Sequence, residues 1–337
     1  MSLLSSIQNQ KIFVAALDWG MGHLTRCSAI IQKLLNQHND IVIFSTQKQS
    51  PFYNQLFPNT KQVIIPEYAV NYYPNNLVKT ILTQYFRFIK SIKKENDFLK
   101  SYVSQHTKPD LIISDSRFGF YHSDIKSIII THQIELQLPY FFQWARKINF
   151  YLINHFDEIW IPDYEDLKQS LAGKLSHTNN LTLKNKIHYI LPQSLMRPIK
   201  AENSIDYLFV ISGTAAEKLY YEKLFLHYAQ RIQKINNHSK IVIIGGINTD
   251  KNLLKGWTNF DETNELFLKA RNIITRAGYS TLMDWGKIKQ PHQQLFLIDS
   301  KHQYEQKYLY KYWLQKGWAK DIKPLLSKII VNKKLKH

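Results

Sequence analysis

The stretch Asp18-Trp19-Gly20-Met21-Gly22-His23-Leu24-Thr25-Arg26 decides how the chain is interpreted. It follows an apolar run at 12–17, which has the pattern of a buried parallel strand. Behind it apolar residues recur at helical spacing, at Cys27, Ile30, Ile31, Leu34 and Leu35. The stretch is therefore expected to join the first strand to the first helix, at the carboxyl edge of a sheet, where open α/β folds bind their ligands.

Two glycines and a histidine give this loop its chemistry. Gly20 and Gly22 allow the backbone to approach a ligand closely. His23 is expected at or near the helix N-terminus, and it is the side chain of the loop that exchanges a proton near neutral pH. Thr25 stands where a dinucleotide fingerprint has its third glycine, so that fingerprint is absent. The loop alone leaves open an alternative, a glycine-rich turn with a capping histidine.

The composition limits the class of protein and its partners. A chain of 337 residues is long enough for two domains. Its single cysteine, Cys27, excludes an internal disulfide and favours a reducing compartment, so a cytoplasmic location is expected. The N-terminus lacks the pattern of a signal peptide, and no run is long enough to span a membrane. The net charge of +18 indicates anionic partners such as phosphorylated ligands, nucleic acid or an acidic membrane surface, unless it reflects compositional drift.

Strand and helix patterns alternate through the first half of the chain. Further strands are expected at 41–45, 63–65, 110–114, 127–131 and 158–163. Asp115 and His132 follow two of these strands directly, and so lie at the same sheet edge as the opening loop. Two aromatic, basic amphipathic stretches, 77–103 and 138–156, could lie on an anionic bilayer, or could pack on the sheet with a solvated lysine face.

The pattern restarts after a polar, proline-bearing segment at 196–204, which is typical of a linker. Strands are expected at 206–211, 240–244, 272–275 and 294–298, with a helix at about 263–270. Strands that alternate with helices form parallel sheets. The sequence therefore predicts an α/β protein with one parallel-sheet domain at 1–200 and a second at 201–337, whose last helix could cross back to the first domain.

Three motifs of the second half suit a phosphorylated ligand. Ser212, Gly213 and Thr214 lie between a strand and a helix, where backbone N–H groups and the helix dipole attract an anion. The lysine of a P-loop is missing, which argues against an ATPase. The other two motifs supply a glycine, hydroxyl groups and carboxylates, at Arg276, Gly278, Ser280, Thr281, Asp284, Glu305 and Gln306. Asp284 is placed to take ribose hydroxyls and Glu305-Gln306 to grip a sugar, although helix capping would explain the same residues.

With these residues the chain resembles the GT-B glycosyltransferases. Among them it is most similar to the family 28 group, which includes the N-acetylglucosaminyltransferase that makes the lipid-linked peptidoglycan precursor. The resemblance covers nearly the whole chain and is carried by four motifs in order: Gly20-Met-Gly-His23, Ser212-Gly-Thr214, Arg276-Ala-Gly…Asp284 and Glu305-Gln306. It implies two Rossmann-like domains that face each other across a cleft.

The resemblance also implies roles for these residues. His23 would deprotonate the acceptor hydroxyl, and Asp115 resembles the carboxylate that orients this histidine in some relatives. The second domain would hold a nucleotide-sugar donor, expected to be a UDP-sugar, with its diphosphate at Ser212, Gly213 and Thr214 and its ribose at Asp284. The segment from Trp257 to Phe260 would lie near the base. Inverting transfer without a metal or cofactor is expected, because helix N-termini and loop donors can offset the charge of the leaving diphosphate.

Two alternatives remain beside sugar transfer. Asp18-Trp19 departs from the small residues of the peptidoglycan enzyme, so that enzyme's acceptor cannot be carried over. The loop, with Arg26 after His23, also looks like that of a nucleotide-sugar hydrolase, which would use water instead. The basic charge and the two amphipathic stretches fit a lipid-linked or membrane-proximal acceptor, and a peripheral place on the inner face of the membrane. The charge also raises a non-enzymatic nucleic-acid binder, although no RNA-binding motif is recognisable.

Overall fold

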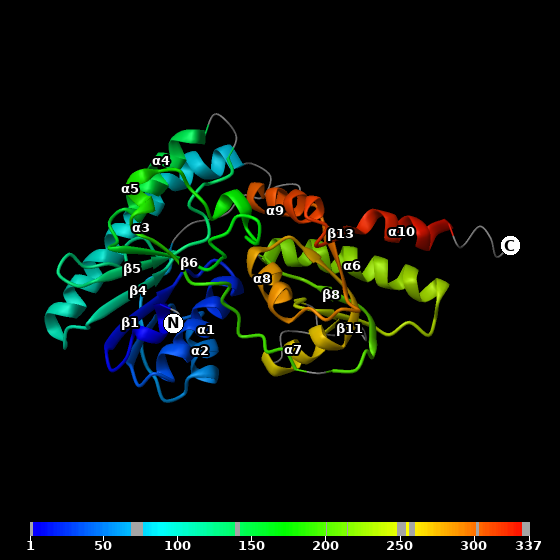
Figure 1. Ribbon diagram of the computed structural model, residues 1–337, viewed down its shortest axis with the longest axis horizontal. Helices are drawn as coiled ribbons and strands as arrows, with labels where there is room; N and C mark the ends of the chain where they lie inside the picture. Colours follow the sequence, from blue (N-terminus) through cyan, green and yellow to red (C-terminus); the bar gives the residue numbers. More distant parts are fainter. Residues whose placement is uncertain are drawn as a thin grey trace. The chain divides into compact units, whose positions relative to one another are not determined.

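The computed structural model describes residues 3–68, 77–138, 142–199, 201–213, 215–247, 254–255, 260–300 and 303–331. The chain divides into two compact units, Met1–Ser194 and Leu195–His337, each built around its own sheet (Figure 1). The sequence predicted this division after residue 200. Each unit is described by itself below.

The first unit holds a sheet of seven strands in the order β3-β2-β1-β4-β5-β6-β7. Every neighbouring pair is parallel, as the alternation of strands and helices predicts. The strands are β1 (Lys11–Ala16), β2 (Asp40–Ser45), β3 (Lys61–Ile64), β4 (Leu111–Asp115), β5 (Ser127–Ile130), β6 (Glu158–Ile161) and β7 (Ile187–Tyr189). The edge strand β7 was missed by the sequence analysis. β6 ends at Ile161 instead of at Asp163, because Pro162 has no N–H for the ladder.

Helices cover both faces of this sheet. They are α1 (Met21–Leu35), α2 (Ser50–Leu56), α3 (Leu77–Gln105), α4 (Gln143–Ile153) and the short α5 (Leu181–Lys184), with 3-10 turns η1 (Leu3–Ser6) and η3 (Gly173–Leu175). Alternate side chains of the central strand β1 point to opposite faces. Ile12 and Val14 join a core with α1, whereas Phe13 and Ala15 join a core that includes Leu99 of α3. The buried sides of α1 and α3 thus fix the strand whose end carries the opening loop.

The second unit repeats the plan with six parallel strands in the order β10-β9-β8-β11-β12-β13. They are β8 (Ile205–Val210), β9 (Ile241–Ile244), β10 (Leu254–Lys255), β11 (Ala270–Arg276), β12 (Gln294–Ile298) and β13 (Lys320–Asp321). The helices are α6 (Ala215–Ile235), α7 (Phe260–Lys269), α8 (Tyr279–Ile288), α9 (Tyr304–Gln315) and α10 (Ile322–Val331). Residues of α6 and α10 pack with Phe209 and Phe296 on one face of the sheet. The two-residue strands β10 and β13 were not predicted.

The strand order brings the predicted site residues of each unit to one edge. In the first sheet β4 lies between β1 and β5, and Asp115 is in register with Ala16 on one side and Ile130 on the other. In the second sheet β8 and β11 are neighbours, with Val210 opposite Thr275. The loops that follow each of these strands therefore start side by side. Within the described part of the chain, no helix combines the length and apolar character needed to cross a bilayer.

Candidate active-site residues

The opening loop turns into α1 through a glycine in a left-handed conformation. Gly20 has φ +94° and is the N-cap of α1, without a side-chain cap bond to the helix. A residue with a Cβ atom is strained at this φ, even though the space around Gly20 is open. Gly22 and His23 follow in the first helical turn, so the predicted position of His23 at the helix N-terminus is confirmed. The alternative in which His23 caps the helix is not what the structure shows, because the cap residue is Gly20.

His23 and Asp115 meet, although they are far apart in the sequence. The Nδ1 atom of His23 lies 2.8 Å from Oδ1 of Asp115, and the carboxylate is fully buried at the end of β4. The backbone N–H of Leu17 donates to the carbonyl oxygen of Asp115 over 2.9 Å, which ties the opening loop to this strand end. An ionised carboxylate can only accept, so Nδ1 of His23 carries a proton, and in the uncharged form of the ring the lone pair is on Nε2. The side chain of His23 is 18% exposed, so the imidazole ring is partly accessible to solvent.

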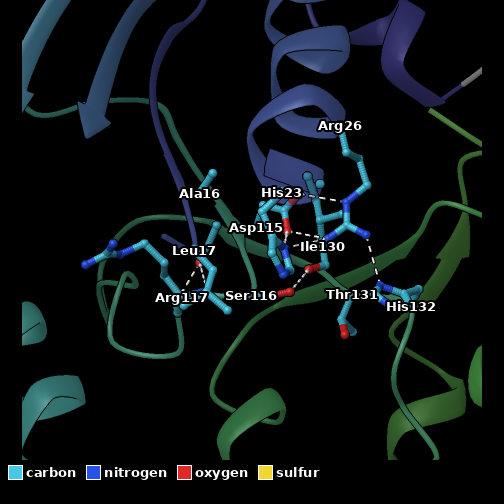
Figure 2. A network of polar contacts seen from close by, with 12 residues as sticks. Ala16, Leu17, His23, Arg26, Asp115, Ser116, Arg117, Ile130, Thr131 and His132 are labelled. Atoms are coloured by element: carbon cyan, nitrogen blue, oxygen red, sulfur yellow. Dashed lines mark hydrogen bonds and ion pairs between the residues drawn. The ribbon is translucent and has the colours of Figure 1, made fainter. Parts of the chain in front are cut away.

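Arg26 completes the cluster from α1, and its guanidinium lies between Asp115 and His132 (Figure 2). It lies one turn after His23 on α1, and its Nε atom donates to Oδ2 of Asp115 over 2.8 Å, while Nη2 donates to Oδ1. The other terminal nitrogen, Nη1, lies 2.9 Å from Nδ1 of His132, which follows β5. Neither Arg26 nor His132 is predicted from the sequence to belong to the site. The available signal was that Arg26 lies three residues after His23, the spacing that places two side chains on one helix face.

The charges of this cluster decide its protonation. Burial raises the pKa of Asp115, but the guanidinium of Arg26 and the imidazole of His23 outweigh it, and the net pKa of the carboxyl is well below its ordinary value. Cys27 and Tyr53, both fully buried, are close enough to feel the charge of Asp115. Burial is the main reason why the pKa of each is raised, so thiol and phenol stay neutral. Asp115 is thus the carboxylate of an ionic pair with Arg26, and Cys27 is a packing residue, as its sequence context predicted.

A second buried charge cluster supports the loop at Asp18. The guanidinium of Arg117 is fully buried, pairs with Glu95, and lies 4.7 Å from the ring centre of Tyr68. Its Nη1 atom is 3.9 Å from Oδ1 of Asp18, too long for a hydrogen bond. Burial raises the pKa of Asp18, and Arg117 offsets this only in part. Next to it Trp19 is 48% exposed, with its ring centre 6.0 Å from that of Phe88 on α3.

In the second unit, the predicted phosphate loop rests on a buried arginine. Gly213 has φ +110°, which places its backbone in the region that favours glycine. Arg276 is 1% exposed, and it donates from Nη1 to Glu217 over 2.8 Å and from Nη2 to the carbonyl oxygen of Ser212 over 2.9 Å. Gln303 also donates to Glu217, over 2.7 Å. The structure thus shows Arg276 holding the Ser212–Gly213 loop in place, and its predicted contact with the donor stays a prediction.

The loops after β8 and β11 come together as predicted. Gly278 is the N-cap of α8, and a methyl group placed on it would lie 3.8 Å from Oγ of Ser212 and 3.9 Å from Oγ1 of Thr281. Ser280 and Thr281 lie in the first turn of α8, and the cap is the glycine, so the alternative in which these hydroxyls cap the helix is wrong. Asp284 is on the same helix and partly buried. Ser212, Gly278 and Thr281 thus form one small cluster at the sheet edge.

Two further residues predicted to contact the donor lie on α9, and three others fall wholly or partly outside the residues that the structure describes. Glu305 and Gln306 lie in the first turn of α9, with Glu305 partly exposed and Gln306 buried. The Oε1 atom of Gln306 accepts a 2.7 Å bond from Ser300, so this side chain is held by the chain itself. Phe260 is the first residue of α7, but its side chain falls outside the described residues. Thr214 also lies outside them, as does Trp257.

The described residues contain no group of three or more His, Cys, Asp or Glu side chains that could hold a metal ion. The chemistry that they do offer is proton transfer at His23, together with backbone N–H groups and hydroxyls at the starts of α6 and α8.

Comparison with known proteins identifies the fold. No protein-family model matches the chain, and no curated protein matches its sequence. Solved structures do match over most of the chain. UGT89C1 from Arabidopsis thaliana, complexed with UDP-L-rhamnose, is 16% identical with a TM-score of 0.56, over 90% of this chain and 83% of that one. CalG4, the calicheamicin glycosyltransferase, is 10% identical with a TM-score of 0.61, over 93% and 86% of the two chains.

A third neighbour is UGT2 from Phytolacca americana, complexed with UDP-2fluoro-glucose and pterostilbene. It is 14% identical with a TM-score of 0.57, over 92% of this chain and 84% of that one. These neighbours are GT-B glycosyltransferases, and the predicted GT-B fold of two Rossmann-like domains is confirmed. At such identities the likeness concerns the fold. The resemblance to the family 28 group in particular stays a prediction.

Proposed function

We propose that this protein is a glycosyltransferase that moves a sugar from a UDP-sugar to an acceptor hydroxyl. The observation that carries the proposal is the pair of His23 and Asp115, in which Nδ1 is bound and Nε2 is left as a base at the sheet edge. It occurs on a fold shared with structures that hold UDP-sugars. A histidine in this state can accept the proton of an alcohol as the new bond forms.

The reaction follows from these groups. Nε2 of His23 takes the proton of the acceptor hydroxyl, while the acceptor oxygen forms a bond to the anomeric carbon of the sugar. The bond from that carbon to the diphosphate oxygen breaks, and UDP leaves with the electron pair. Attack opposite the leaving group inverts the anomeric centre. The Ser212–Gly213 loop and the N-terminus of α6 would meet the diphosphate charge through N–H groups, without a metal ion.

Other residues would hold the rest of the donor. Asp284 would accept hydrogen bonds from the ribose hydroxyls, with Ser280 and Thr281 beside it at the start of α8. Glu305 would contact the sugar from the first turn of α9. Gln306 is buried and bonded to Ser300, so it would act by fixing this turn. Arg276 would act through the Ser212 loop that it supports.

The acceptor side is proposed to face a membrane or a lipid-linked substrate. Phe86 of α3 is 77% exposed and Tyr151 of α4 is 66% exposed, while Tyr85 and Trp144 place the two helices in contact. Exposed basic residues lie on the same two helices, at Arg87, Lys90, Lys93, Lys94 and Lys147. Aromatic side chains among cations are the composition that binds an anionic lipid surface.

The test is turnover of UDP-sugars by the whole protein, with soluble alcohols, phenols and lipid-linked sugars offered as acceptors. His23→Ala should lower turnover by about 100-fold or more, the usual contribution of a general base, and keep UDP affinity. His292→Ala, which removes an exposed imidazole in the second unit, is the control. Wild-type turnover in His23→Ala would refute the role of His23.

The same assay separates the alternatives. Free sugar released in the absence of any acceptor would mean that water takes the place of the hydroxyl, which is the hydrolase alternative. Oligonucleotide binding that weakens steeply with salt, without binding of any UDP-sugar, would support the nucleic-acid alternative instead.

A further inference from the structure

Asp115 does not serve His23 alone, because most of its hydrogen-bonding capacity is used by Arg26. Both carboxylate oxygens accept bonds from the guanidinium, through Nε to Oδ2 and through Nη2 to Oδ1, and only Oδ1 also faces His23. Arg26 is 3% exposed and Asp115 fully buried, so solvent screens neither charge effectively. The two charges cancel, and the pair adds no net charge beneath the imidazole.

The guanidinium also touches the imidazole directly. Nη2 of Arg26 is 3.1 Å from Nδ1 of His23, a contact between two N–H groups that both donate to Oδ1 of Asp115 and do not bond to each other. Nη1 is 2.9 Å from Nδ1 of His132. A guanidinium has only donors, so Nδ1 of His132 must be the acceptor, and His132 must be uncharged in this arrangement. A proton added to His23 would place a second cation next to the guanidinium. Cys27 and Tyr53, which also lie near Asp115, are neutral and supply no compensating charge.

We infer that Arg26 is the positioning residue of the proposed active site: it fixes the Asp115 carboxylate with Oδ1 toward His23 and keeps the imidazole uncharged. This inference rests on the proposed function. Without Arg26, the buried carboxylate would keep His23 as a hydrogen-bonded partner that can become a cation. The imidazole would then hold a second proton as the partner of Asp115, and Nε2 would no longer be free to accept one from the acceptor hydroxyl.

The test replaces Arg26 in two ways. Arg26→Met keeps most of the side-chain volume and removes the charge, whereas Arg26→Lys keeps the charge and loses the planar, two-point contact. Arg231→Met is the matched control, because it removes an exposed guanidinium from α6 of the second unit. Nitrogen NMR of isotopically labelled histidine reports which ring nitrogens carry protons. The His23 signal is assigned by its loss in His23→Gln, and urea unfolding of each variant shows whether it folds.

At neutral pH, His23 of the wild-type protein should be uncharged with its proton on Nδ1. Arg26→Met should show a doubly protonated ring, with kcat about 100-fold lower, KM for the donor unchanged, and kcat recovering toward alkaline pH. Arg26→Lys should keep the uncharged ring and part of the activity. Arg231→Met should match the wild type in both measurements. A merely structural role for Arg26 would lower kcat without changing the protonation of His23.

The NMR measurement needs no substrate, so it decides the role of Arg26 even if no UDP-sugar is turned over. An uncharged His23 in Arg26→Met would overturn the inference, and so would a wild-type His23 with its proton on Nε2. Because the position of the proton on His23 is measured in the wild-type protein, it tests the inference even if Arg26→Met does not fold. Absence of turnover in the wild-type protein would overturn the proposed function alone.

Discussion

Gly213→Ala should disrupt the second unit, whereas Gly278→Ala, on the adjacent loop, should not. At Gly213 the backbone has φ +110°, and a methyl group would overlap the guanidinium of Arg276 and lie 2.7 Å from Oε2 of Glu217. Arg276 cannot move aside cheaply, because it is buried and bonded to Glu217 and Ser212. At Gly278 φ is −74°, and the same methyl group makes only ordinary contacts, at 3.8 Å and beyond.

The magnitude follows from three effects. A left-handed backbone costs an L-residue roughly 1–2 kcal/mol, and overpacking a filled site costs about 1–3 kcal/mol. The lower chain entropy of unfolded alanine returns about 0.4–1 kcal/mol. Gly213→Ala should therefore lower the free energy of unfolding by about 1–4 kcal/mol. For Gly278→Ala two small effects remain. The lower chain entropy of the unfolded state stabilises the protein, the loss of a glycine at the N-cap of α8 destabilises it, and the net change in the free energy of unfolding is close to zero.

Amide hydrogen exchange suits this comparison, because it reports on the second unit separately from the first. Peptides that cover β8 and β11 should exchange about 30-fold faster in Gly213→Ala for a loss of about 2 kcal/mol. Gly278→Ala should exchange at nearly the wild-type rate, and peptides of β1 and β4 should be unchanged in both variants. Equal protection in the two variants would refute the argument that Arg276 and the positive φ at Gly213 fix this loop.

Two further predictions concern buried carboxylates of the first unit. Burial alone would raise the pKa of Asp115, but Arg26 and His23 lower it in the folded state. The ionised carboxylate therefore stabilises the folded protein above the ordinary pKa of 3.8, and this stabilisation is lost as the pH falls below that value. Asp115→Asn should lower the free energy of unfolding by about 3–5 kcal/mol at neutral pH, because it removes the carboxylate that pairs with the buried guanidinium of Arg26, and the difference should shrink in acid. Urea unfolding that shows a constant difference at every pH would contradict this. For Asp18 burial raises the pKa, against the smaller effect of Arg117, so its charged form costs stability once the pH exceeds the ordinary value. Asp18→Asn should therefore be more stable than the wild type at neutral pH and equal to it in acid, and a neutral-pH loss in the same urea assay would show the reasoning to be wrong.

Much of the fold could be predicted from the sequence because its strands are central and buried on both faces. Runs such as 12–17 and 241–244 are continuously apolar, and the helices between them require parallel pairing. The edge strands β7 and β13 were missed for the opposite reason. Ile187–Tyr189 and Lys320–Asp321 are short and carry polar residues, so their pairing depends on the neighbouring strand instead of on their own pattern.

For the site, the sequence by itself placed His23 at a helix start and Asp115 at a strand end, because glycine turns and strand ends have local signals. Only the tertiary structure decided what surrounds them. Arg26 reaches Asp115 and His132 because α1 packs over the ends of β4 and β5, and helical spacing does not say which strand ends a side chain will meet. Arg276 is likewise predicted as a donor contact from the sequence, and only the structure shows that it is buried and holds the carbonyl oxygen of Ser212. Local patterns record backbone conformation, whereas charge pairing is set by residues that meet only after the chain has folded.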